Sequence, residues 1–249
     1  MRRKKPASPA QIARHIRAVL KHDGYAPYSQ SAQRFFKETI QAHGWRTHEL
    51  RKVGATFRRT LLRERGPEFL LAVADQLFRG PVIDDKNMAI FLLEKDAAGL
   101  GDAEFRLLDS WLDRVTNWAE HDALAHNLIG PLVAADEKRA PRLLAWARSK
   151  NRWRRRAACV ALIRAARQRR LFPEIVRVSN RLLSDPDDMV QKGLGWLLRE
   201  TAKADPQKTV PYLLKLRARA PRLVLRTACE TLPAATRARV LADPPSVVK

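Results

Sequence analysis

The chain has 249 residues, and its 45% hydrophobic content is enough to bury a continuous core. Its 48 lysines and arginines outnumber 26 acidic residues, which gives a net charge of +22. These values exclude a disordered chain and indicate a polyanionic partner. Nucleic acid is preferred to an anionic membrane because tryptophans are scattered among the basic residues. The longest apolar run, residues 157–163, is far shorter than the roughly 20 residues that span a bilayer.

The first helix is predicted to begin at Ser8-Pro9-Ala10-Gln11 and to end at Asp23-Gly24. The opening combines a capping serine, a proline at the first helical position and a glutamine three residues after the cap. We expect one helical domain over residues 8–242, with flexible tails at residues 1–7 and 243–249.

The same pattern repeats along the chain, with apolar residues at spacings of three and four between turn signals. These signals are Gly44, Gly66-Pro67, Gly80-Pro81, Gly99-Leu100-Gly101, Gly130-Pro131, Pro141, Pro173, Asp185-Pro186, Asp205-Pro206, Pro221 and Pro233. About a dozen helices of roughly 10 to 18 residues are predicted, and no strands, because sustained apolar/polar alternation is missing.

Short helices in pairs, with bulky residues recurring about every 35 to 45 residues, favour an all-α superhelical solenoid of HEAT-like repeats. Such a solenoid would present a concave basic face suited to duplex DNA. The identity between successive units is low, so an irregular all-α bundle is the alternative.

Neither the cysteines nor the histidines form a metal-ligand pattern. Cys159 and Cys229 each stand alone in an apolar helical stretch, which is typical of reduced core thiols in a cytosolic protein. The six histidines lack the spacing of a ligand set, so no metal site is expected.

Basic residues concentrate between Lys138 and Arg170, where no acidic residue occurs. This basic stretch contains Lys138, Arg139, Arg142, Arg148, Lys150, Arg152, Arg154, Arg155, Arg156, Arg164, Arg167, Arg169 and Arg170. Phosphate binding is the functional interpretation, and a solvated basic helix face is the alternative. Such contacts would carry no sequence specificity.

Trp118 and Asp122 are four residues apart, so on a helix they share one face. A core tryptophan beside a surface aspartate is the plain structural interpretation of the pair. The nearby Arg156 and the later Trp196 favour a functional one, because separate helices would then offer a cation and π surfaces to one basic groove. Trp45, Trp111, Trp146 and Trp153 are assigned to the core.

Four segments of the chain carry a specific resemblance. They are RFFKETIQAHGWRTHELRK, NWAEHD, the N-x-W-x-x-R-A-A pattern of residues 151–158, and QKGLGWLLRE followed by AKADP at residues 202–206. With these segments, residues 30–230 resemble the AlkD-like DNA alkylpurine glycosylases, a family of HEAT-like proteins in DNA alkylation repair.

The resemblance implies a monofunctional glycosylase of base excision repair. Its substrates would be cationic N3- and N7-alkylated purines, such as 3-methyladenine and 7-methylguanine, in duplex DNA, and the lesion would stay stacked during cleavage. The resemblance also implies a cytoplasmic monomer, nucleoid-associated when bound to DNA, with no metal, no cofactor and no membrane partner.

The same resemblance assigns four roles within the site. Asp122 falls on the catalytic carboxylate, Trp118 and Trp196 on two indoles that hold the lesion's sugar, and Arg156 on an arginine that holds the backbone. Together with the basic stretch, it predicts DNA contacts at Phe35, Lys37, Arg46, Thr47, Arg51, Arg152, Arg154, Arg155 and Lys192.

Two positions depart from the family pattern, since Phe35 stands in place of tyrosine and Arg46 in place of glutamine. Both departures put the substrate preference in doubt rather than the chemistry. A catalytically silent relative that binds branched or distorted DNA is the first alternative, and a scaffold for acidic proteins or RNA is the second. Asp122 argues for catalysis, because a carboxylate in a phosphate-binding groove repels DNA.

Overall fold

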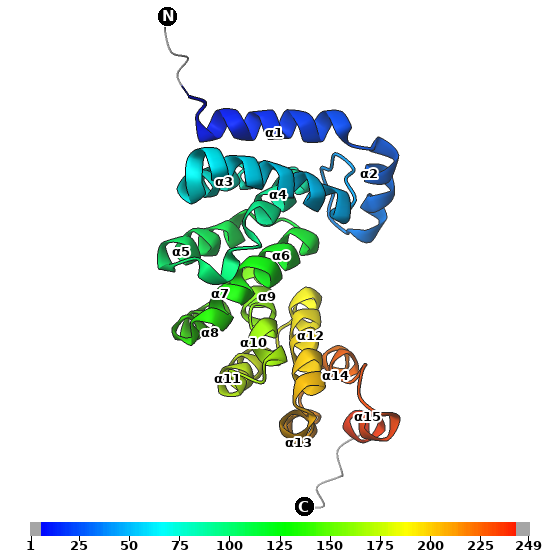
Figure 1. Cartoon of the computed structure of the whole chain (residues 1–249). Helices are drawn as coiled ribbons and strands as arrows, with labels where there is room; N and C mark the ends of the chain where they lie inside the picture. The colour runs from blue at the N-terminus through cyan, green and yellow to red at the C-terminus, as the bar shows by residue number, and fades with distance from the viewer. Residues whose placement is uncertain (1–5, 243–249) are drawn as a thin grey trace, which may run out of the picture. The chain divides into compact units, whose positions relative to one another are not determined.

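Residues 6–242, the part of the chain that the computed structural model describes, contain helices and no strand (Figure 1). An isolated bridge joins Gln41 to Val82. The predicted all-α class is therefore confirmed for these residues. No described helix is both long and apolar enough to cross a membrane. The predicted tails lie outside the described residues, except that Pro6 and Ala7 belong to no regular element.

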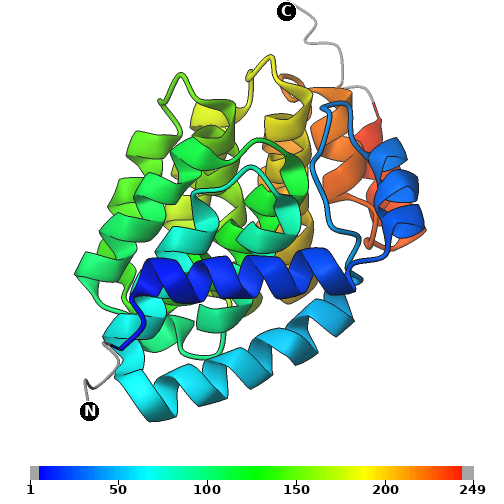
Figure 2. The same ribbon diagram turned by 90° about the horizontal axis from the view of Figure 1, so that it is seen from above.

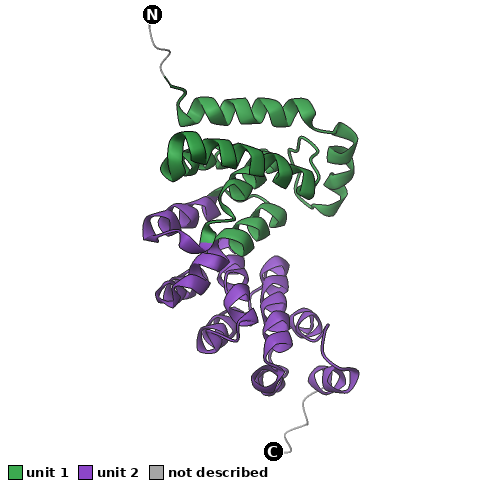
Figure 3. Cartoon of the chain, in the orientation of Figure 1, with its two compact units in different colours: residues 1–97, 114–128 green, residues 98–113, 129–249 purple. Residues whose placement is uncertain are grey.

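The chain divides into two compact units (Figure 3). Unit 1 takes the residues up to 97 together with 114–128, and unit 2 takes 98–113 together with the residues from 129 onward. The expectation of one domain over residues 8–242 stays a prediction.

Unit 1 holds five α-helices and the short η1. They are α1 (Pro9–Asp23), α2 (Ala26–Ala32), η1 (Gln33–Phe35), α3 (Thr47–Phe78), α4 (Ile83–Leu93) and α6 (Trp118–Leu124).

Unit 2 holds the remaining α-helices. They are α5 (Asp102–Trp111), α7 (Gly130–Ala135), α8 (Ala140–Trp146), α9 (Arg152–Val160), α10 (Ile163–Arg167), α11 (Phe172–Leu182), α12 (Asp188–Ala204), α13 (Pro206–Leu216), α14 (Arg222–Ala228) and α15 (Ala234–Leu241). Short segments at η2 (Ala97–Gly99), η3 (Leu112–Arg114), η4 (Ala125–Ile129) and η5 (Glu137–Arg139) complete the chain.

Helix α1 begins and ends where the sequence predicts. The Ser8 hydroxyl accepts the backbone N–H of Gln11 at 3.3 Å, and the Gln11 side chain accepts the N–H of Ser8 at 2.7 Å. This capping box satisfies two backbone donors that the first turn would leave unpaired. Ile16 and Leu20 are buried one turn apart, and α1 packs along α3 through that face (Figures 1 and 2).

Helix α3 contains the predicted break at Gly66-Pro67. Gly66 has φ of 81° and ψ of 176°, which separates two helical stretches within Thr47–Phe78. Glycine adopts this conformation readily because it lacks a Cβ atom, and Pro67 then starts the second stretch.

The predicted break at Gly130-Pro131 is wrong. A helical path runs from Trp118 to Ala135, with the π-helical segment η4 between α6 and α7. Pro131 stands in the first turn of α7, where its missing N–H costs least. Several helices are also shorter than predicted. Helix α10 has five residues because a turn at Ala161 and Leu162 separates it from α9.

Helix α12 is central to unit 2 and packs against α9, α10, α13 and α14. A Cβ atom at Gly193 would lie 3.0 Å from the Arg156 Cγ, and one at Gly195 would lie 2.6 Å from the Thr227 Cβ. Close helix packing therefore requires both glycines, as the sequence predicts. Cys159 and Cys229 are buried free thiols, and burial raises the pKa of Cys159 to about 12.

Candidate active site and nucleic-acid interface

Helix α6 places Trp118 and Asp122 one turn apart, as their spacing predicts. Asn117 caps this helix, because its side-chain oxygen accepts the backbone N–H groups of Ala119 and Glu120, each at 3.1 Å. Trp118 is 37% exposed, and the Asp122 side chain is 21% exposed. The start of α6 thus offers an indole and a carboxylate that solvent reaches.

The indole of Trp118 is fixed by the segment around η1. Its Nε1–H donates to the backbone oxygen of Phe35 at 3.2 Å. The ring of Phe36 is stacked on the indole, with centroids 5.2 Å apart and an angle of 16° between the planes. One indole face is therefore covered by Phe36, which leaves the other for a ligand. Phe35 itself is 63% exposed.

The carboxylate of Asp122 is held by its neighbour His121. The His121 Nδ1 lies 2.8 Å from the Asp122 Oδ1, and the His121 side chain is fully buried. An aspartate next to a rigid ring in this way loses rotational freedom. The contact fixes the carboxylate before any substrate arrives.

A buried ion pair lies one residue earlier on α6. Lys86 of α4 donates to the Glu120 Oε2 at 2.8 Å and to the backbone oxygen of Arg114 at 2.7 Å. The same Glu120 oxygen accepts the backbone N–H of Thr116 at 3.0 Å. Both charged side chains are at most 2% exposed, so this network sets the position of α6 against α4.

Residues 36–46 are attached to the start of α4. The Asp84 Oδ2 accepts the backbone N–H of His43 at 2.5 Å and that of Gly44 at 3.1 Å. Burial raises the pKa of the Asp84 carboxyl, although these two hydrogen bonds oppose the rise. Ile83 N–H also donates to the Gln41 oxygen at 2.9 Å. The segment that carries Lys37 and Arg46 is therefore fixed at several points.

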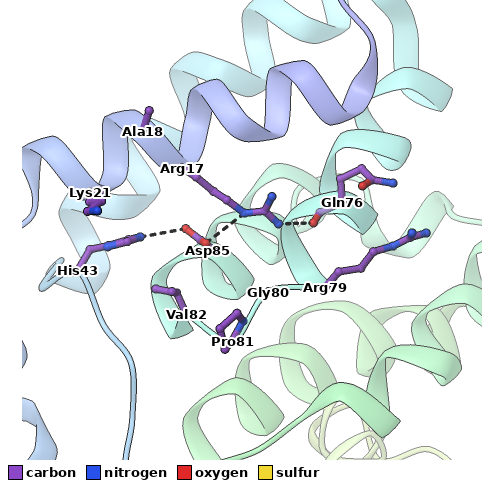
Figure 4. Close-up of a pocket in the computed structure, with 10 residues that line it drawn as sticks. All are labelled: Arg17, Ala18, Lys21, His43, Gln76, Arg79, Gly80, Pro81, Val82 and Asp85. Carbon is purple, nitrogen blue, oxygen red and sulfur yellow. Dashed lines mark hydrogen bonds and ion pairs between the residues drawn. The ribbon is translucent and has the colours of Figure 1, made fainter.

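Figure 4 shows a second junction of unit 1, where Asp85 lies between Arg17 and His43. The distances are 3.2 Å from the Arg17 Nε and 3.3 Å from the His43 Nε2. Arg17 also donates to the backbone oxygen of Gln76. The open cavity of about 660 Å³ at this place is lined by groups that bind one another, which makes it a link between α1 and α4 rather than a ligand site.

Arg156 and Trp196 lie in unit 2. Arg156 of α9 is 5% exposed, runs alongside Gly193, and donates to the backbone oxygen of Met189. Trp196 on α12 is half-buried, and Lys192 stands one turn before it on the same face. Lys192 forms an ion pair with Asp188 at 3.1 Å.

The four predicted catalytic residues are divided between the units. Trp118 and Asp122 come together on α6 in unit 1, whereas Arg156 and Trp196 belong to adjoining helices of unit 2. Each pair is defined within its own unit. That all four surround one sugar stays a prediction.

The predicted DNA contacts in unit 1 differ in how their charge is used. Arg51 is bound by Glu94 through bonds of 3.1 to 3.3 Å and lies over the Phe91 ring. Arg46 precedes α3, and its guanidinium lies 5.9 Å from the centroid of Tyr28. Thr47 begins α3, and Lys37 is exposed. Their contact with DNA stays a prediction.

The basic stretch is largely neutralised by acidic residues from elsewhere in unit 2. Arg154 binds both Asp109 and Asp113, and Arg155 binds Asp185 at 2.6 Å. The hydrogen bond from Arg154 lowers the pKa of Asp113. Further ion pairs engage Arg139, Arg142, Arg152, Arg167 and Arg170. The absence of acids in the sequence between 138 and 170 therefore overstates the free charge.

Two basic residues of the stretch have no ion pair within residues 6–242, namely Arg148 and Lys150, and both are exposed. Replacing both by alanine should leave stability within about 0.5 kcal/mol. Duplex binding should weaken, with the salt slope reduced by up to about 0.9 per lost phosphate contact. Fluorescence anisotropy at several salt concentrations measures this.

Arg154→Ala is the matched variant and should behave differently. It leaves the buried Asp109 with fewer partners, so the free energy of unfolding should fall by about 1–3 kcal/mol. Urea unfolding of both variants checks the contrast. Equal stability in the two, with DNA binding lost only in Arg154→Ala, would assign phosphate binding to Arg154 after all.

Sequence reasoning missed Phe36 and His121. Phe36 gave no signal, because its contact with Trp118 joins segments more than 80 residues apart. His121 was set aside with the other histidines for lack of metal-ligand spacing. Its position next to the carboxylate in NWAEHD was the available signal, although adjacent residues on a helix ordinarily point apart.

Comparisons with known proteins agree with this architecture. The profile of the DNA alkylation repair enzyme family matches residues 16–232. A structure described as a predicted DNA alkylation repair enzyme from Enterococcus faecalis is 16% identical with a TM-score of 0.75, and the match covers 85% of this chain and 97% of that one. AlkD2 from Streptococcus mutans is 20% identical with a TM-score of 0.61, covering 89% and 100%.

A third structure, smu.31 from Streptococcus mutans UA159, is 20% identical with a TM-score of 0.55, covering 75% and 99%. A search of curated proteins found no significant match. At these identities the structures show a shared fold, and the family profile spans most of the chain. The chain belongs to the DNA alkylation repair enzyme family.

Proposed function

We propose that this chain is a monofunctional glycosylase that removes cationic N3- and N7-alkylated purines from duplex DNA. The observation that carries the proposal is on α6, where the carboxylate of Asp122 is fixed by His121 one turn from the exposed indole of Trp118. Family membership and the basic composition of the chain support DNA as the substrate.

The chemistry requires stabilisation of a sugar cation. An N3- or N7-alkylated purine is positively charged, so its glycosidic bond is weak and the base leaves without a general acid. At an effective dielectric constant near 20, a carboxylate about 4 Å from the resulting oxocarbenium ion contributes roughly 4 kcal/mol. Asp122 would supply this charge and orient the attacking water.

The indoles would add to this stabilisation. Cation–π attraction to a desolvated aromatic face is worth about 1 to 2 kcal/mol. The face of Trp118 opposite Phe36 is the one that remains for the sugar. Trp196 and Arg156 would supply the second indole and the backbone contact, as the resemblance implies.

The direct test is to incubate the protein with methylated duplex DNA and to measure released 3-methyladenine and 7-methylguanine by chromatography. Unmethylated duplex is the control, because neutral purines have strong glycosidic bonds and should survive. Release at the spontaneous rate, with binding to duplex retained, would contradict the proposal.

Base release should also persist in a chelator. The described residues include no group of three or more histidine, cysteine, aspartate or glutamate side chains placed to hold a metal ion. The leaving group is already cationic, so a Lewis acid adds little. The same chromatographic assay with EDTA checks this expectation. Loss of activity in EDTA, followed by recovery with a divalent metal, would show that the mechanism is wrong.

A further inference from the structure

A cavity of about 260 Å³ lies within unit 1, next to the exposed indole. Its lining comes from α2, η1, residues 36–47, the start of α4 and the start of α6. Aromatic side chains supply much of the wall, from Tyr28, Phe36, Trp45 and Trp118. The volume is small for a drug-sized ligand and suits one planar bicyclic ring system.

Two polar side chains of α4, Asp84 and Asn87, complete the lining. Asp84 is 5% exposed, and both of its hydrogen bonds reach the Oδ2 atom, so the Oδ1 atom takes part in neither. The Asn87 Oδ1 is buried and has no hydrogen-bond partner within the described residues. Buried acceptors without partners are uncommon in folded proteins and call for a donor.

The combination of groups defines the chemistry of the occupant. Aromatic walls favour a flat π system, and both they and a buried carboxylate favour a positive charge. The two acceptors favour a ligand with N–H groups at its edge. The guanidinium of Arg34, an exposed lining residue, lies 4.9 Å from the centroid of Phe35, where it suits a phosphate attached to the ligand.

We propose that this cavity binds the positively charged base of an alkylated purine nucleotide. The proposal rests on the proposed function for its link to Trp118, which would face both the sugar and the base. Contacts to the sugar alone would leave selection to the lability of the glycosidic bond. The cavity adds direct recognition of the charged base, and it requires that base to leave the helical stack.

Binding can be measured without DNA and without catalysis. Titration with 7-methylguanosine in slightly acidic buffer, where the nucleoside keeps its positive charge, should quench tryptophan fluorescence. Guanosine, which is neutral and of nearly the same shape, is the matched ligand. We expect 7-methylguanosine to bind about tenfold more tightly or better, and isothermal calorimetry supplies an independent affinity.

Asp84→Asn isolates the charge. The amide oxygen can accept the same N–H groups of His43 and Gly44, so residues 36–46 should stay in place. Affinity for 7-methylguanosine should fall about tenfold, while affinity for guanosine stays unchanged. Asp23→Asn, which removes an exposed carboxylate of unit 1 outside the cavity, is the control and should change neither affinity.

Asn87→Leu removes the unpaired acceptor without breaking a hydrogen bond. The unfolding temperature should be equal or higher, whereas both nucleosides should bind less tightly. Equal binding of the two nucleosides to the parent protein, or unchanged affinities in both variants, would overturn the proposal. Base release from methylated DNA without nucleoside binding would leave the glycosylase standing and remove the cavity, and the reverse result would do the opposite.

Discussion

Replacing Lys86 by methionine is expected to lower the free energy of unfolding by about 3–5 kcal/mol, because the buried Glu120 would lose its charged partner. Methionine retains much of the length of lysine, so the variant removes the charge with little change in packing. Urea unfolding followed by circular dichroism gives the value.

Two further variants sharpen this prediction. Lys86→Met combined with Glu120→Leu should recover much of the lost stability, because a buried ion pair replaced by apolar side chains is often neutral or better. Arg51→Met breaks the partly exposed pair with Glu94 and should cost at most about 1 kcal/mol. If Lys86→Met cost no more than Arg51→Met, the buried pair would not fix the position of α6.

Local signals in the sequence predicted local structure well. The Ser8 and Gln11 spacing gave both ends of the capping box in α1, because every atom involved lies within one turn. The four-residue spacing of Trp118 and Asp122 placed both on one face of α6 for the same reason. Helical geometry converts such short spacings directly into neighbourhood in space.

Contacts between distant segments could not be predicted in this way. The arginines of the basic stretch meet carboxylates that lie tens of residues away, as Arg154 does with Asp109 and Asp113. A count of charges along the chain sees the arginines and not their partners. The free positive charge in unit 2 is therefore smaller than the sequence suggests, and it gathers at exposed residues such as Arg148 and Lys150.

The site itself was predicted in outline and not in its support. Asp122 and Trp118 were identified by resemblance, but each depends on a contact that no pattern revealed. Phe36 covers one face of the indole, and His121 fixes the carboxylate. If the proposed chemistry holds, these two supports determine which atoms meet the substrate. They also separate the geometry of the site from its charge, which makes a clean test possible.

Asp122→Asn is expected to slow base release by roughly 10²- to 10³-fold, equivalent to about 2.7 to 4 kcal/mol of barrier. Asparagine keeps the shape of the side chain, and its amide oxygen can still accept the hydrogen bond from His121. The variant therefore removes the charge and leaves the contact that fixes the side chain. Single-turnover release of 7-methylguanine from methylated duplex measures the effect.

Binding supplies the control for that experiment. Undamaged duplex should bind Asp122→Asn as tightly as the parent protein or more tightly, because a negative charge has left a surface that would face phosphates. Trp118→Ala should instead lose part of both binding and rate, since the indole would contact the sugar before and during cleavage. Release at the parent rate by Asp122→Asn, with helical content unchanged, would remove Asp122 from the mechanism. It would then favour a protein that binds distorted DNA without cleaving the glycosidic bond.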